Sequence, residues 1–251
     1  MGSTSSNDFV AIYIALFVII IMGVVLKHVL RNQNETRRQI PLMVIAGVLL
    51  VLEIVKQVYH IICGDWHTWY IPLHFCSYFL VWYAVALFTR GKIRQTMYAC
   101  SLTGGFIVSL LLLVAPRMIL HSATVDIFAN FNNFHTFFYH IGVMAYWIWM
   151  LLLKVYHYET AHLKRTIVFH IGFFFVTIIG AHVFQENFTN VLRADIAIME
   201  DLRLSAGQFT YTMVLFLVGV GAISLVASAV HFIMKKLYHK NLNQEELTNN
   251  K

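Results

Sequence analysis

Long apolar stretches, separated by short polar ones, run along almost the whole chain. A helix needs about 20 predominantly apolar residues to cross the hydrocarbon core of a bilayer. Seven stretches of the sequence meet this requirement, so we predict an all-α, polytopic membrane protein with seven transmembrane helices. The predicted helices cover residues 9–30, 39–62, 70–89, 95–115, 134–154, 166–184 and 207–232.

The connections between these stretches are short and leave little room for a domain outside the membrane. We expect one seven-helix transmembrane domain over residues 9–232, after a short outside segment at residues 1–8. A polar, basic cytoplasmic tail is expected at residues 233–251. The first segment has no basic residue, which favours a first spanning helix over a cleaved signal peptide.

Composition supports this interpretation, and the positions of the charges add an orientation. Of the 251 residues, 59% are hydrophobic and 12% are charged, about half the usual charged share of roughly 25%. Too few charges are present to cover a soluble protein. Basic residues gather on alternate connections, so the positive-inside rule predicts an outside N-terminus and a cytoplasmic C-terminus. Their scatter over four connections argues against a nucleic-acid partner. The expected cytoplasmic residues are Lys27, Arg31, Arg37, Arg38, Arg90, Lys92, Arg94, Lys154, Lys164, Arg165, Lys235, Lys236, Lys240 and Lys251.

A few polar residues fall inside the predicted helices, where charged side chains are costly and usually functional. Glu53 and Lys56 lie three residues apart, and with His60 they share one helical face. They are interpreted either as a neutralised pair that fastens the helix to its neighbours or as the wall of a polar cavity. With the predicted topology, five helices place polar side chains at one level on the outer side. That set comprises Glu53, Lys56, Gln57, His60, His74, Cys76, Ser77, His135, His140, His182, Gln185, Glu186, Asn187, Gln208 and Tyr211.

Three kinds of chemistry fit this set. A cysteine with a histidine in reach can form a thiolate and accept an acyl group, and Cys76 with His140 is the best such combination. His60, His74, His135, His140 and His182 could ligate a metal or haem, but no diagnostic ligand spacing occurs.

The third kind is ion-coupled transport, for which a buried pair such as Glu53 and Lys56 is suited. A retinal protein is excluded because the predicted helix 207–232 contains no lysine. Cys63 and Cys76 both lie on the outer side, and a disulfide between them is left open.

The segment Pro72-Leu73-His74-Phe75-Cys76 resembles the bacterial YwaF family of integral membrane proteins. It is also similar to the related animal family of transmembrane protein 164, described as a phospholipid acyltransferase with a catalytic cysteine and histidine. The resemblance extends from the predicted helix 39–62 to the predicted helix 207–232. It further rests on Glu53, Lys56, Phe138-Tyr139-His140 and Asn187-Phe188. The chain departs from the pattern in a first helix without a histidine near its start, and in a longer, more acidic segment after Phe188.

The resemblance implies an enzyme that moves an acyl group between membrane lipids through an acyl thioester, without a metal or another cofactor. Cys76 would be the nucleophile and His140 its base, while Glu53, Lys56 and His74 would orient the site or bind a headgroup. The bacterial members suggest a bacterial plasma membrane. We expect supporting or substrate-binding roles for His60, Ser77, His135, His182 and Asn187.

Overall fold

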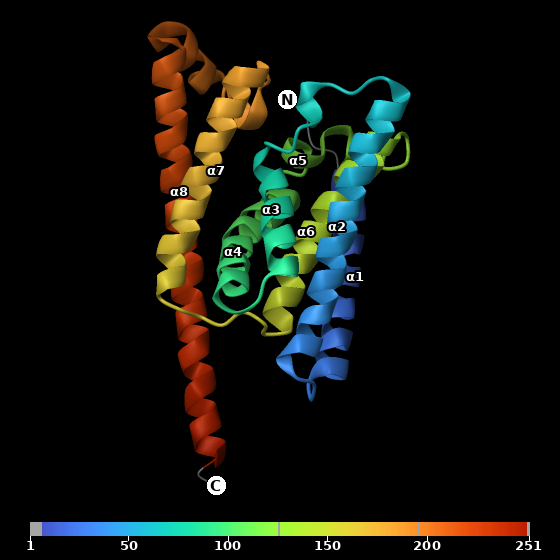
Figure 1. Ribbon diagram of the computed structural model, residues 1–251, viewed down its shortest axis with the longest axis vertical. Coiled ribbons are helices and arrows are strands. Elements are labelled where there is room, and N and C mark those ends of the chain that lie inside the picture. Colours follow the sequence, from blue (N-terminus) through green and yellow to red (C-terminus); the bar gives the residue numbers. More distant parts are fainter. Residues whose placement is uncertain (1–6, 125, 195, 250–251) are drawn as a thin grey trace. The chain divides into compact units, whose positions relative to one another are not determined.

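A computed structural model describes residues 7–124, 126–194 and 196–249, and every regular element within them is a helix (Figure 1). Short 3-10 turns occur at Thr68–Tyr70, Phe75–Ser77, His121–Thr124 and Phe188–Asn190. The predicted all-α fold is confirmed. The α-helices are α1 (Asn7–Leu30), α2 (Glu35–Cys63), α3 (Tyr78–Phe88), α4 (Gly91–Val114), α5 (Arg117–Leu120), α6 (Phe131–Leu152), α7 (Ala161–Phe184) and α8 (Ala197–Asn249).

Five of these helices are long and apolar enough to cross a membrane, namely α1, α2, α4, α7 and residues Ala197–Lys236 of α8. The protein is therefore a multi-pass membrane protein. Two of the seven predicted spans, α3 and α6, do not meet the same standard. With 11 residues, α3 is roughly 16 Å long at about 1.5 Å per residue, while α6 has the length but carries several polar side chains.

The predicted helix 70–89 was wrong at its start, because the α-helix begins only at Tyr78. Residues 64–77 form an irregular segment that includes two 3-10 turns. A proline disfavours helical geometry at the residue before it, so Pro72 keeps Ile71 extended (ψ 132°). Cys76 consequently lies in a 3-10 turn that precedes α3, and not within the helix itself.

Specific capping residues fix the ends of α2 and α6 that face this segment. Gly64 ends α2 in a left-handed conformation (φ 70°), which glycine adopts without steric cost. Asn130 caps the N-terminus of α6, where its side chain accepts a hydrogen bond of 2.9 Å from the backbone N–H of Asn133. These caps fix where α2 ends and where α6 begins.

The helices form two compact units, one up to Tyr156 and one from His157 onwards. In the first unit, α6 contacts α1, α2 and α4, while α3 packs on α2 and α4. Large aromatic side chains fill this core, and the rings of Tyr83 and Tyr146 stack at 4.1 Å. In the second unit, α7 packs along α8, where the Phe174 ring contacts Phe216.

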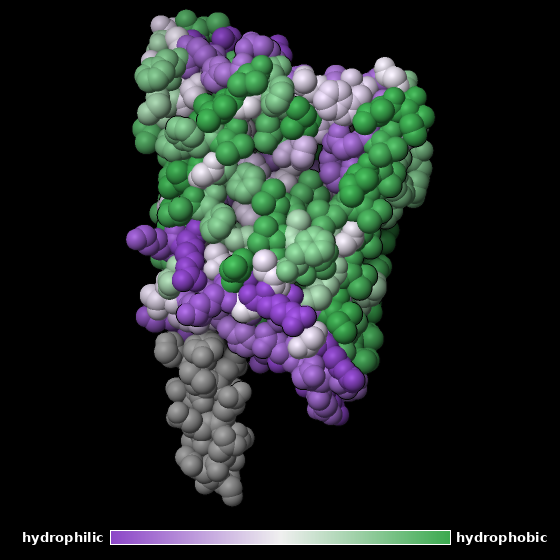
Figure 2. All heavy atoms as spheres, in the orientation of Figure 1, coloured by the Kyte–Doolittle hydropathy of each residue, from purple (hydrophilic) through white to green (hydrophobic). Residues whose placement is uncertain are grey.

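Apolar side chains cover most of the exposed helix surfaces, as expected for contact with lipid. On α1, Ile14 is 60% exposed and Phe17 is 65% exposed. Figure 2 shows apolar side chains along α2, with hydrophilic ones gathered where α1 turns into α2. An apolar belt with a polar end is the distribution that a bilayer and its surface require.

Hydrogen bonds bring three basic connections to one end of the first unit. Arg38 donates from Nη1 to the Leu153 carbonyl at 3.4 Å, and Arg94 donates from Nη1 to Oε1 of Gln39 at 2.5 Å. Gln95 donates to the Val155 carbonyl at 3.0 Å. The connections α1–α2, α3–α4 and the end of α6 therefore lie together, as alternate loops of a membrane protein should.

Close packing of α4 against α6 gives a first testable prediction. A Cβ atom added at Gly105 would lie 2.9 Å from the Cβ of Trp147, and at Gly47 it would meet nothing within 4 Å. Gly105→Ala should lower the free energy of unfolding by about 1–3 kcal/mol through overpacking. Gly47→Ala, the control, should be neutral or stabilise by up to about 1 kcal/mol. Thermal unfolding in detergent measures both variants, and equal midpoints would contradict this packing.

Candidate functional site

Glu53 is the centre of a charged cluster in the first unit. Its Oε1 atom lies 2.6 Å from the Lys56 ammonium and accepts a hydrogen bond of 2.8 Å from Gln57. Its Oε2 atom lies 3.3 Å from Nε2 of His135 on α6. Glu53 is 8% exposed and His135 is 7% exposed. The carboxylate therefore has partners at both oxygens and joins α2 to α6.

His60 forms a second junction, about two turns further along α2 than Glu53. Its Nδ1 atom lies 2.8 Å from Oδ1 of Asp65, and its Nε2 atom lies 2.7 Å from Oδ1 of Asn132. The imidazole also stacks on Tyr70 at 3.8 Å, while Gln57 donates to the Tyr70 carbonyl at 2.6 Å. These contacts fasten the irregular segment 64–77 against α2 and the start of α6.

The turn that carries Cys76 is attached directly to α6. The Tyr139 hydroxyl donates a hydrogen bond of 3.0 Å to the Cys76 carbonyl, and the Tyr139 ring stacks on His135 at 5.6 Å. Cys76 is half-buried, and both Cys76 and Cys63 are free thiols. Through His135 and Tyr139, the charged cluster is therefore linked to the backbone of the turn that carries the thiol.

His140 follows Tyr139 on α6 and is buried. Its Nδ1 atom lies 2.7 Å from the Thr136 carbonyl oxygen. Because a carbonyl oxygen can only accept, Nδ1 carries the proton, and in the neutral ring the lone pair is on Nε2. This is the tautomer that a general base needs. His170 makes the same contact with the Thr166 carbonyl, so the bond alone does not identify a catalytic residue.

Contacts within the first unit link four of the expected site residues to the Cys76 turn, and two others belong to the second unit. Glu53, Lys56, His60 and His135 are linked to the Cys76 turn, as described above. Of the remaining residues of this unit, Ser77 follows Cys76, the His74 ring contacts Trp69 at 4.3 Å, and His140 follows Tyr139 on α6. His182 and Asn187 belong to the second unit.

Several residues of the site were not assigned a role of their own from the sequence, although Gln57 belonged to the predicted polar set and Tyr139 to the family motif. Tyr139 lies four positions after His135, the spacing at which helical side chains meet, and this was the available signal. Gln57 lies four positions after Glu53 in the same way. Asp65, Tyr70 and Asn132 lie in loops or at a helix start, and nothing in their local sequence indicates contact with His60.

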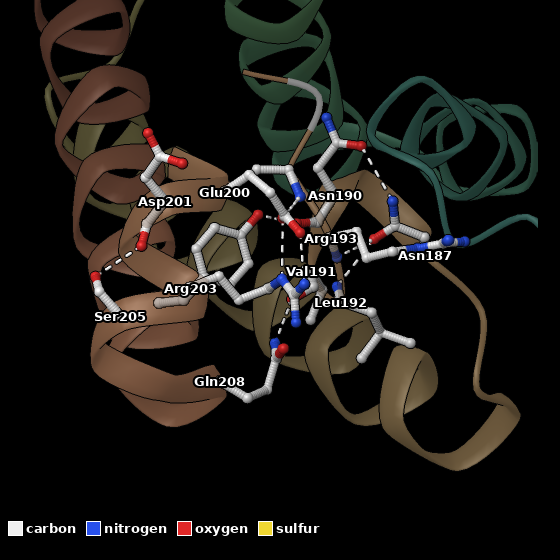
Figure 3. Close-up of polar contacts among 12 residues, drawn as sticks. Asn187, Asn190, Val191, Leu192, Arg193, Glu200, Asp201, Arg203, Ser205 and Gln208 are labelled. Carbon is white, nitrogen blue, oxygen red and sulfur yellow. Dashed lines mark hydrogen bonds and ion pairs between the residues drawn. The ribbon is translucent and has the colours of Figure 1, made fainter. Parts of the chain in front are cut away.

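The second unit contains a separate polar cluster around Asn187 (Figure 3). Oδ1 of Asn187 accepts hydrogen bonds of 2.9 Å from the backbone N–H groups of Leu192 and Arg193. Gln208 on α8 donates to the Val191 carbonyl at 2.8 Å. Asn187 therefore shapes the loop between α7 and α8. The same loop is held by Glu200, which accepts from Arg203 and from the Ala194 N–H, and by Tyr211, which donates to the Asn190 carbonyl.

Metal ligation needs at least three donors that converge on one point. Among the residues that the structure describes, no group of three or more His, Cys, Asp or Glu side chains could hold a metal ion. The contacts of Glu53 with His135 and of His60 with Asp65 are separate pairs. The described residues therefore provide no ligand set that would support the metal or haem alternative.

Comparison with known proteins identifies a family for the chain. No curated protein and no solved structure matches it. A model of the TMEM164 family matches residues 2–235. The expected relation to transmembrane protein 164 is confirmed, whereas the relation to YwaF stays a prediction. Since the match covers nearly the whole sequence, the chain belongs to the TMEM164 family.

Proposed function

We propose that the protein is an integral-membrane lipid acyltransferase that uses Cys76 as nucleophile and His140 as general base. The observation that carries the proposal is the hydrogen bond from Tyr139 to the Cys76 carbonyl. It fastens the thiol-bearing turn to α6 one residue before His140. Membership of the TMEM164 family is consistent with an acyltransferase-like role in a membrane.

The proposed reaction has two steps that share the same base. His140 takes the thiol proton, and the Cys76 thiolate attacks the carbonyl carbon of a lipid ester. A C–S bond forms, the ester C–O bond breaks, and the leaving alkoxide receives the proton from His140. In the second step, His140 takes a proton from the hydroxyl of a lyso-lipid. That oxygen attacks the thioester, the C–S bond breaks, and the thiolate regains its proton.

The surrounding residues would position the reacting groups. Glu53 and Lys56 hold α2 against α6 through His135, and their charges would orient a lipid headgroup beside the thiol. His74 and Ser77 flank Cys76 and would line the same site. His60 would support it by anchoring segment 64–77. His182 and Asn187 belong to the second unit, and their supporting role stays a prediction.

The proposal includes seven spans in a bacterial plasma membrane, with an outside N-terminus and a cytoplasmic C-terminus. Three basic connections share one end of the first unit, which the positive-inside rule assigns to the cytoplasm. Glu53, His60 and the start of α6 are joined near the opposite end. In this orientation the site would face the outer leaflet, close to the ester bonds of its lipids.

An acyl thioester on Cys76 is the direct test. Mass spectrometry of the purified protein should find a hydroxylamine-sensitive acyl group on the peptide that contains Cys76, increased in His140→Ala. A thiol is intrinsically nucleophilic, whereas an acceptor hydroxyl depends more on the base, so the second step should slow more. Cys63→Ala should leave the adduct unchanged as a control. An adduct that persists in Cys76→Ala would contradict the assignment.

A second function, an ion-coupled carrier, is favoured by one observation. Glu53 and Lys56 form an ion pair whose side chains are 11% and 14% exposed, and charged residues at membrane depth often couple ion movement to transport. A carrier would need this pair and would not need the thiol of Cys76. Replacement of Cys76 and replacement of Glu53 therefore distinguish the two functions.

A further inference from the structure

A basic cavity lies at the end of the first unit where α1 turns into α2, away from the Cys76 turn. It has a volume of about 210 Å³ and is formed by the end of α1, the start of α2 and the end of α6. Seven described residues line it, and four of them are cations, with no acidic residue among the seven. The four are Lys27, Arg31, Arg38 and Lys154.

The cations converge from three different helix ends, which is not required for membrane orientation. Orientation depends on the number of basic residues near a span, and exposed side chains on separate loops would serve equally well. Here Arg38 reaches across to the end of α6, where Nη1 donates to the Leu153 carbonyl at 3.4 Å. Its Nε atom is buried without a hydrogen-bond partner. Lys154 extends from a left-handed backbone position (φ 51°).

Helix carbonyls offset only part of this positive charge. The C-terminal ends of α1 and α6 carry a partial negative charge, equivalent to roughly half an elementary charge each. About three of the four positive charges therefore remain in excess. A bound anion would relieve their mutual repulsion and would satisfy the guanidinium groups with charge-assisted hydrogen bonds.

The rest of the cavity wall is apolar. Leu30, Leu152 and Leu153 complete the lining. On the same two helices, Val29, which precedes Leu30, is 63% exposed, and Ile40, two residues after Arg38, is 50% exposed. A ligand with an anionic head and an apolar chain matches both surfaces. Basic pockets between helix ends at a membrane surface are suited to anionic lipid headgroups.

We propose that this cavity binds the phosphate headgroup of an acidic phospholipid, with the acyl chains lying against the adjoining apolar helix surface. The site is separate from the Cys76 turn and does not depend on the proposed acyl transfer. Its expected role is to hold the ends of α1, α2 and α6 together. Acidic lipid should therefore stabilise the folded protein.

Lipid binding to the purified full-length chain tests the proposal. Native mass spectrometry and thermal unfolding in detergent would compare added phosphatidylglycerol, phosphatidylcholine and inorganic phosphate. The wild type should retain phosphatidylglycerol and unfold at a higher temperature in its presence. The double variant Arg31→Gln/Lys154→Asn should lower the affinity at least about tenfold, because each basic residue contributes to the attraction. Both side chains are exposed, and asparagine tolerates the left-handed position.

The matched control removes the same charge at the same end of the unit, outside the cavity. Arg90→Gln/Lys92→Gln should bind phosphatidylglycerol like the wild type. An equal loss in both double variants would overturn the proposal in favour of general surface attraction. Equal retention of phosphatidylcholine by the wild type would overturn it as well. Stabilisation by inorganic phosphate alone, to the same extent as by lipid, would assign the cavity to a free anion and not to a lipid.

Discussion

Replacing Cys76 with alanine is expected to lower the rate of lipid acyl transfer by at least about 10⁴-fold, because no other group in the proposed mechanism can carry the acyl chain. His140→Ala should lower it by about 10²–10⁴-fold, the usual contribution of a general base. Both rates would be measured as transfer of a labelled acyl chain between phospholipids in proteoliposomes.

Residues that act as one unit have non-additive effects, and this sharpens the test. The double variant Cys76→Ala/His140→Ala should be no slower than Cys76→Ala alone. Cys63→Ala, which removes an exposed free thiol, should transfer acyl groups at the wild-type rate. Full activity of Cys76→Ala would contradict the acyltransferase. Loss of solute flux in Glu53→Gln, with normal flux in Cys76→Ala, would instead favour the carrier.

The second large effect concerns the stability of the folded chain. Glu53→Gln removes the charge that neutralises Lys56 and contacts His135. Leaving one buried charge without its partner typically costs about 3–5 kcal/mol. We expect a loss of this order in the free energy of unfolding, measured by denaturant or thermal unfolding in detergent.

A double replacement separates loss of the pair from loss of the carboxylate. Glu53→Leu/Lys56→Leu removes both charges and keeps apolar volume, so it should recover most of the stability lost in Glu53→Gln. It should not recover acyl transfer if the pair orients a headgroup. Similar stability of Glu53→Gln and the wild type would show that the ion pair does not hold α2 against α6.

The hydrophobic pattern predicted where the helices occur, but it did not predict all of their first and last residues. The apolar stretches predicted α1, α2, α4, α6 and α7 within a few residues, since length and composition decide which segments become helical. The start of α3 was missed because the apolar run from Tyr70 conceals the effect of Pro72. Beyond Phe232, α8 continues to Asn249, where the pattern had indicated only a polar tail.

Topology predicted that Glu53 and His135 lie at one level, and the structure brings their side chains into contact. The contacts of His60 could not be anticipated. Its partners Asp65 and Asn132 come from a loop and from the first turn of α6, and their approach depends on how the 64–77 segment folds back. The spacing of residues along one helix does not predict how a separate loop folds against that helix. The chemical roles of Cys76 and His140 stay predictions.

The shortness of α3 has a consequence for the membrane around it. An 11-residue helix covers only about half of a hydrocarbon core that is about 30 Å thick. Non-helical backbone is tolerated at membrane depth only where protein or water satisfies its polar groups. In the proposed seven-span topology, the segment before Tyr78 would therefore be covered by protein, or would sit in a local thinning of the bilayer or along a water-lined indentation. A thinned bilayer or a water-lined indentation would let the Cys76 thiol meet water, lipid esters and lipid hydroxyls at the same place, without a lipid having to leave the membrane.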